Sequence, residues 1–171
     1  MNTHTERVFK NKALSIIFFT LISENENGLN NTEISKKLKK SPTTISRQMD
    51  VLEKAGFVKI KLVDDNRLKK LYYPTLKPFF ENIAKSFNVE FTQDDYDNID
   101  NFLFYSKIKN RVFKISKDVS NVVAELPTVI FKVFAFIGSS EFQNMLYKDP
   151  ELNEKFEKYM KTMSKIKILK F

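Results

Sequence analysis

This chain of 171 residues has no cysteine, a single histidine and only three glycines. The absence of cysteine excludes disulfide bonds, thiolate nucleophiles and thiolate metal sites together. The histidine, His4, lies in a polar N-terminal stretch, where a disordered residue is more common than a ligand. The sequence shows no glycine-rich phosphate loop, no Ser/His/Asp set and no cluster of metal ligands. We therefore expect no enzymatic activity, no cofactor and no metal.

Long hydrophobic runs are also lacking. The longest apolar run, Ala13 to Ile22, is too short to span a bilayer, and no signal peptide is visible. This run predicts instead a buried helix from about Glu6 to Ser23. These absences favour a cytoplasmic protein.

Positive charge is unevenly distributed. The chain has 29 basic and 21 acidic residues, a net charge of +8. Residues 1–88 hold 16 basic and 9 acidic residues, net +7, whereas residues 89–171 hold 13 and 12, net +1. A basic surface concentrates polyanions around it and gives affinity for phosphate groups. An anionic membrane would satisfy the same charge, so charge alone does not choose between the two.

Residues 41–55 predict a helix with both ends marked. Ser41 can accept a hydrogen bond from an orphan amide of the first turn, and Pro42 suits the first helical position. Gly56 can adopt the left-handed conformation that ends a helix, and Lys54 complements the helix dipole there.

One side of this helix is apolar and the other is polar. Ile45, Met49 and Leu52 follow at spacings of four and three, so they form one buried stripe. Away from the stripe lie hydroxyl, amide and guanidinium groups, which are the groups that read base edges in a DNA major groove. A solvated face is the more common explanation for any one of them, but clustering in the N-terminal half is typical of a recognition helix. The candidate base-reading residues are Ser41, Thr43, Thr44, Ser46, Arg47 and Gln48.

A shorter helix is predicted upstream, with Thr32 as its N-cap and with Ile34 and Leu38 on its buried side. The turn after it, Lys39-Lys40, lacks the usual glycine and apolar residue. A lysine stem can cover apolar surface, and lysine can adopt an unusual backbone conformation at some cost. We expect Thr32, Lys39 and Lys40 to lie beside the recognition helix and to contact DNA.

A hairpin is predicted next. Residues 57–62 alternate, with Val58, Ile60 and Leu62 on one face, which indicates a half-buried strand. Residues 64–73 supply a turn and a returning strand. Its basic side chains fit either an ordinary solvated hairpin or a contact with phosphates or the minor groove. The candidate DNA contacts of the hairpin are Arg67, Lys69 and Lys70.

The first half of the chain resembles the winged-helix repressors of the ArsR and MarR type. The resemblance rests on residues 33–38, on residues 41–49 and, above all, on the ending Leu-x-x-Ala-Gly-Phe-Val at residues 52–58. It implies a prokaryotic, nucleoid-associated regulator that binds double-stranded DNA in a sequence-specific manner. The helix at residues 41–55 would enter the major groove, and the wing at residues 57–74 would lie on the backbone or minor groove.

Two alternatives to a sequence-specific regulator stay open at this point. A protein that shapes DNA with weak specificity would show similar affinity for unrelated duplexes. A winged helix used as a protein-interaction module would show no salt-dependent DNA binding.

The second half predicts an all-α region. Thr92 marks a helix start, and there is no glycine or proline after it until Pro127, so we expect one helix from Gln93 to Glu125. Its apolar residues recur at heptad spacing. This seam fits a homodimer contact and the core of its own domain equally well. The predicted interface residues are Ile108, Val112, Ile115, Val119, Val122 and Leu126.

Three further helices are expected. The first starts at Pro127, is apolar nearly all round over residues 129–137 and should be central to a core; the second carries Phe142, Met145 and Leu146; Asp149-Pro150 opens the last. The 17 Phe and 6 Tyr fit a pocket for an apolar effector or, as phenylalanine at helical spacing more often does, plain core. The predicted fold is thus mainly α with a small β-hairpin wing. It divides into a winged helix-turn-helix DNA-binding domain at residues 1–88 and an all-α dimerisation or effector domain at residues 89–171.

Overall fold

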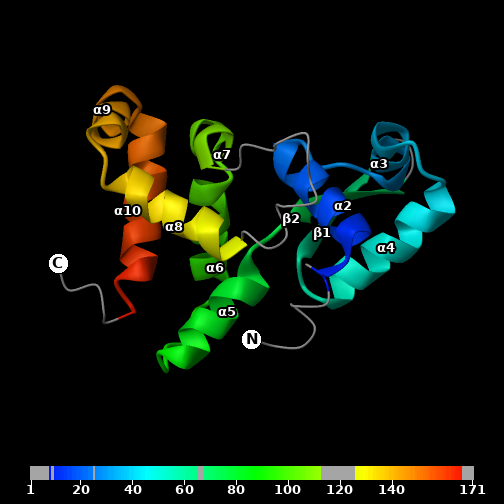
Figure 1. The fold of residues 1–171 in the computed structure, drawn as a ribbon, viewed down its shortest axis with the longest axis horizontal. Coiled ribbons are helices and arrows are strands. Elements are labelled where there is room, and N and C mark those ends of the chain that lie inside the picture. The colour runs from blue at the N-terminus through cyan, green and yellow to red at the C-terminus, as the bar shows by residue number, and fades with distance from the viewer. Residues whose placement is uncertain (1–7, 9, 25, 65–67, 113–125, 167–171) are drawn as a thin grey trace. The chain divides into compact units, whose positions relative to one another are not determined.

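The computed structural model describes residues 8, 10–24, 26–64, 68–112 and 126–166, with the backbone alone for 112 and 126–131 (Figure 1). The described residues up to Pro78 form one compact unit, and those from Phe79 onward form a second. The domain boundary expected after residue 88 thus falls ten residues beyond the division between the units. Among the described helices, none is long and apolar enough to cross a membrane.

The first unit is built around α2, Lys12–Ser23. This helix begins later than the expected Glu6, because Asn11 interrupts the helical run and caps α2. The Asn11 side-chain oxygen accepts hydrogen bonds from the backbone N–H groups of Ala13 and Leu14, at 3.0 and 3.3 Å. As predicted, α2 is a buried helix, and it packs against α3, α4 and β2.

Helix α3, Asn31–Leu38, is capped by Asn30 and not by Thr32 as predicted. The Asn30 side chain accepts from the backbone N–H of Glu33 at 3.0 Å, and the Glu33 carboxylate accepts from the backbone N–H of Asn30 at 2.8 Å. This reciprocal pair satisfies two orphan amides at once. Thr32 therefore lies inside the first turn, where its side chain is exposed.

Helix α4, Pro42–Lys54, has the predicted ends. Ser41 caps it by accepting from the backbone N–H of Thr44 at 3.2 Å, and Gly56 has the positive φ of 78° that ends it. The predicted apolar stripe of the helix is completely buried, since its three members have no exposed surface. In Figure 1, α3 and α4 are joined by a tight turn.

The hairpin consists of β1, Val58–Asp64, and β2, Leu68–Pro74, paired antiparallel. Tyr72 also forms a bridge to Leu29. Gly28, at φ 64°, allows the chain to pass under the Tyr73 ring, because a Cβ there would meet the ring at 2.7 Å. The predicted buried face holds only at the base of the hairpin: Val58 is 7% exposed, but Leu62 is 55% exposed. The strands extend beyond the core that would cover them.

The second unit is helical in all its described parts. Thr92 caps its helix α6, as predicted, through a reciprocal pair with Asp95. Helix α10 packs against α6 and α9, and α8 contacts α7 and α9. The helices of this unit are α5 (Lys77–Ser86), α6 (Gln93–Leu103), α7 (Ser106–Val112), α8 (Leu126–Ile137), α9 (Ser140–Lys148) and α10 (Pro150–Met163).

The prediction of one helix from Gln93 to Glu125 is wrong. The chain leaves the helical path at Phe104 and Tyr105, where α6 ends and α7 begins; Phe104 is buried, and the Tyr105 hydroxyl donates to the Asp149 carboxylate at 3.2 Å. Ile108 is completely buried within the chain, so it is not available for a subunit contact. The side chains of the other predicted interface residues, Val112, Ile115, Val119, Val122 and Leu126, lie outside the described part of the structure.

Aromatic side chains form the core of the second unit. The Phe102 ring lies 4.5 Å from the Tyr159 ring, 5.5 Å from Phe156 and 6.2 Å from Phe142, measured between centroids. These rings therefore act as plain core. Helix α8 is less central than predicted, since Phe134 is 41% exposed.

Candidate nucleic-acid interface

The polar face of α4 is open to solvent. Because the helix buries one stripe completely, the side chains on its other side are left without protein cover. Ser41, Thr43, Thr44 and Arg47 are exposed, and Ser46 is half-buried. The Ser41 and Thr44 hydroxyls lie 2.8 Å apart and share a hydrogen bond. The face thus carries a guanidinium and several short hydroxyls at the N-terminal end of the helix.

Gln48 departs from this pattern. Its side-chain carbonyl oxygen is buried and has no hydrogen-bond partner among the described residues. A glutamine that recognises adenine uses its amide oxygen and nitrogen together. With the oxygen turned inward, Gln48 does not present that pair of groups. Of the six predicted base-reading residues, it is the one whose side chain is oriented differently.

The turn between α3 and α4 adds basic groups to the same end of α4. Lys39 has φ 52° and ψ 43°, which is the left-handed conformation usually reserved for glycine. Its side chain is exposed, whereas Lys40 is half-buried. The backbone N–H of Lys40 donates to the Ser35 carbonyl at 3.1 Å, and the Ser35 hydroxyl donates to the Lys40 carbonyl. These bonds fix the turn despite its unusual sequence.

The basic residues of the hairpin are not equivalent. Successive residues of a strand point to opposite faces, so Lys69 and Lys70 diverge. The Lys69 ammonium lies 3.5 Å from the Glu33 carboxylate, so Lys69 forms an ion pair with α3. Lys70 is exposed. Arg67 lies outside the described residues.

Tyr72 connects the hairpin to α4. Burial raises the pKa of its hydroxyl, and the nearby carboxylates of Glu53 and Asp50 raise it further, whereas a hydrogen bond with Asn31 acts in the opposite direction. The hydroxyl therefore stays protonated. Sequence reasoning missed this residue as a positioning group. Tyr72 lies on the same strand face as the buried Pro74, and this alternation could have indicated that Tyr72 is buried.

Four cations of the first unit are electrostatically unmatched. Within the described part of the chain, none of Lys39, Lys40, Arg47 and Lys70 forms an ion pair with another residue. A cation without a partner retains its full attraction for an external anion. Lys39, Lys40 and Arg47 lie in or just before the N-terminal half of α4, and together with the exposed hydroxyls they make this part of the helix suitable for a polyanion.

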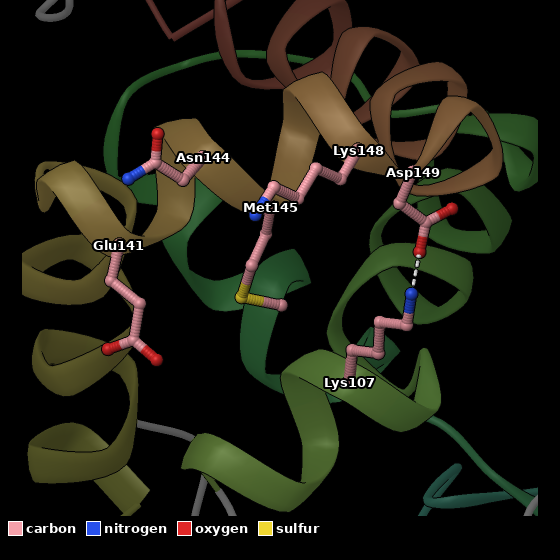
Figure 2. A pocket seen from close by; sticks show the side chains of 6 residues that line it. All are labelled: Lys107, Glu141, Asn144, Met145, Lys148 and Asp149. Atoms are coloured by element: carbon pink, nitrogen blue, oxygen red, sulfur yellow. Dashed lines mark hydrogen bonds and ion pairs between the residues drawn. The ribbon is translucent and has the colours of Figure 1, made fainter.

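The second unit contains a separate pocket of about 360 Å³ beside α7 and α9 (Figure 2). Its charged walls are largely neutralised: Lys107 lies 2.6 Å from Asp149, and Arg111 lies 2.5 Å from Glu141. Figure 2 shows Met145 projecting between Glu141 and Lys107. The lining contains no aromatic residue, so it does not match the apolar effector site considered from composition. The residues that line it are Lys107, Glu141, Asn144, Met145, Lys148 and Asp149.

Comparison with known families agrees with the fold of the first unit. Residues 20–59 match a family model described as winged helix-turn-helix DNA-binding. The matched segment runs from the end of α2 through α3 and α4 into β1. The match supports DNA binding by this unit and covers 40 of the 171 residues. A comparison with curated proteins gave no significant match.

Proposed function

We propose that this protein is a sequence-specific regulator of transcription that binds double-stranded DNA as a homodimer. The observation that carries the proposal is the exposed polar face of α4, opposite a stripe without any exposed surface. A helix held by one side and polar on the other fits the major groove, which admits an α-helix. The function needs no catalytic chemistry.

Each group of the face has a distinct role in this proposal. The Arg47 guanidinium is suited to a bidentate contact with a guanine edge, which carries sequence information. The hydroxyl of Thr43 reaches either a base edge or a phosphate. Lys39, Lys40 and Lys70 contact phosphates, which fix the register of the protein on the duplex without reading sequence.

A dimer is proposed because a single reading surface is small. Two copies present two recognition helices to a two-fold operator, with half-sites about one helical turn apart or a multiple of it. We propose that the second unit supplies the subunit contact. The relationship to ArsR and MarR repressors, a prokaryotic origin and a place at the nucleoid belong to the same proposal, supported by the resemblance at residues 33–58.

Selection of bound genomic fragments, and then gel shifts at several salt concentrations, test this function. We expect a few fragments to bind at least a thousandfold more tightly than random duplex at physiological salt. Equal affinity for all duplexes would instead identify a DNA-shaping protein of weak specificity. An absence of salt-dependent binding would identify a protein-interaction module. Light scattering at micromolar concentration measures the dimer independently of DNA.

A further inference from the structure

The pocket of the second unit is formed mainly by one side of α9, and we call it the α9 pocket. Four of its six lining residues lie on that side, because each is three or four residues from two of the others. These residues are Glu141, Asn144, Met145 and Lys148. The rest of the lining is Lys107 of α7 and Asp149, which follows α9. Its volume of about 360 Å³ falls within the range of about 300–1,000 Å³ that is usual for small-molecule sites.

The two carboxylates of the α9 pocket are already matched within the chain. One oxygen of Asp149 lies 2.6 Å from the Lys107 ammonium, as the dashed line in Figure 2 marks, and the other accepts from the backbone N–H of Leu152 at 3.1 Å. Glu141 is paired with Arg111 at 2.5 Å. The carboxylates therefore hold the walls of the pocket together, and neither one calls for a cation from solution.

The Lys148 ammonium and the Asn144 amide are left available to a ligand. Within the described part of the chain, neither side chain forms a hydrogen bond or an ion pair. Helical side chains tilt toward the N-terminus of their helix, and Figure 2 shows Lys148 extending along α9 in the direction of Met145. Its ammonium thus lies over the turn that carries Asn144 and the Met145 thioether. The α9 pocket offers one unmatched positive charge, one neutral hydrogen-bonding group and one apolar surface.

We propose that the α9 pocket binds a small organic monocarboxylate with a short aliphatic chain. The Lys148 ammonium pairs with the carboxylate of the ligand, and the Asn144 amide nitrogen donates a hydrogen bond to it. The flexible Met145 side chain packs against the aliphatic part. The site lies wholly within the second unit, so this inference does not depend on DNA binding.

The charges around the pocket specify a ligand with a single negative charge. Lys107 and Lys148 together balance Glu141 and Asp149, and Arg111 adds one positive charge from outside the lining. One carboxylate neutralises that excess. A phosphate ester carries nearly two negative charges at neutral pH, and the carboxylates of the wall would repel the second of them.

The test uses the full-length protein with its methionine methyl groups labelled with carbon-13, and hexanoate as the probe. Hexanoate should shift the Met145 methyl signal in NMR spectra and saturate it, with a dissociation constant on the order of 1 mM. Met49 is completely buried in the first unit, so its signal is the internal reference and should not move. Hexanamide has the same chain without the charge, and inorganic phosphate has charge without the chain. Both should bind at least about tenfold more weakly than hexanoate.

Three variants assign the binding to the named groups. Lys148→Gln should raise the dissociation constant of hexanoate at least about tenfold, because the charged partner is lost. Asn144→Asp is nearly isosteric and should do the same, since a carboxylate one turn before Lys148 pairs with its ammonium. Lys161→Gln is the matched control and should leave binding unchanged. Like Lys148, Lys161 is exposed in the last turn of its helix and has no ion pair among the described residues.

Several outcomes would overturn the inference. Equal binding of hexanoate and hexanamide would show that the ligand charge is not recognised, and tighter binding of phosphate would replace the carboxylate by another anion. A Met145 shift that grows without saturating would mean non-specific association. Native affinity in Lys148→Gln, or an equal loss in Lys161→Gln, would also contradict it. Circular dichroism of each variant checks that the fold is kept, as the exposure of the three replaced side chains leads us to expect.

Discussion

In the second unit, three lysines end 2.6 Å from a carboxylate: Lys107 at Asp149, Lys165 at Asp95 and Lys158 at Glu154. In the first unit, Lys39, Lys40, Arg47 and Lys70 have no such partner among the described residues. The net charges of the two halves, +7 and +1, show the same division. The first unit also has matched pairs, Lys37 with Glu24 and Lys69 with Glu33, so the difference between the two halves is one of net charge, and the excess positive charge of the first half is what attracts a polyanion.

Two of these carboxylates, Asp149 and Asp95, are buried. Hydrogen bonds from Lys107 and from the backbone N–H of Leu152 lower the pKa of Asp149. For Asp95, burial alone would raise the pKa, but hydrogen bonds from Lys165 and Thr92 outweigh it and lower the pKa. Both carboxylates cap a helix and connect it to another element. They are therefore structural rather than candidate catalytic groups.

The largest expected effect is a loss of stability in one unit and not in the other. Phe102→Ala removes a ring with no exposed surface from the core formed by α6, α9 and α10. It should lower the free energy of unfolding of the second unit by about 3–5 kcal/mol. Hydrogen exchange should show loss of protection in α6 and α10, with α2 and α4 still protected.

The matched change in the first unit is Phe57→Ala. The Phe57 ring is also completely buried, and its centroid lies 5.6 Å from that of the Phe18 ring. It should remove protection from α2 and α4 first. Equal loss of protection in both units for either variant would show that the chain unfolds as one cooperative body, and the two units would then differ in charge alone.

The next effect concerns binding. Arg47→Ala should weaken operator affinity by roughly 1–3 kcal/mol while leaving random duplex nearly unaffected, because a base contact is lost and not a phosphate contact. Thermal stability should hardly change, since the side chain is exposed. Gel shifts with both duplexes measure the difference.

Arg111→Ala is the control for Arg47→Ala. Arg111 is 61% exposed, but it is paired with Glu141, so its removal should not alter DNA affinity. If Arg47→Ala weakens operator and random duplex equally, Arg47 contacts a phosphate, and sequence must be read by other side chains of α4.

The elements that could be predicted from sequence are those with local causes. The ends of α4 depend on Ser41, Pro42 and Gly56, which act within one turn of the helix. Its buried stripe results from helical periodicity alone. The candidate reading face was then the remaining side, and its exposure agrees with that expectation.

The wrong predictions involve either residues that are far apart in sequence or two neighbouring residues that could fill the same position. At the break after α6, Tyr105 bonds to Asp149, which is 44 residues away in sequence. The pairing of Lys69 with Glu33 spans 36 residues. At α3, Asn30 and not Thr32 is the cap, because Glu33 stands three residues after Asn30 and completes the reciprocal pair.

A smaller effect tests the structural role of matched charge. Asp149→Asn keeps an oxygen that can cap α10 but removes the ion pair with Lys107, which is itself 53% exposed. At neutral pH, the free energy of unfolding should fall by roughly 1–2 kcal/mol. Because the native pKa is lowered, the carboxylate stabilises the fold fully above the ordinary aspartate value of about 3.9, and this stabilisation is lost as the pH falls below it.

Denaturant unfolding of Asp149→Asn and native protein at neutral pH and at about pH 3 checks this dependence. The difference between the two proteins should shrink in acid. A constant difference at all pH values would mean that the carboxylate charge is irrelevant and that only the shape of the cap matters.

The smallest expected effect is at Lys39, where one substitution should raise stability and lower DNA affinity. Lys39 holds the left-handed conformation at φ 52°, which costs a residue with a Cβ more than it costs glycine. Lys39→Gly should therefore raise the free energy of unfolding by about 0.5–1 kcal/mol. The same change removes an unpaired cation next to α4, so affinity should fall alike for operator and random duplex, with a salt slope smaller by about 0.9.

Lys36→Gly, in the middle of α3, is the opposing control and should destabilise the protein by about 1 kcal/mol. A stabilised Lys39→Gly protein with native affinity would show that Lys39 supplies only the turn, and the phosphate contacts would then have to come from Lys40 and Lys70.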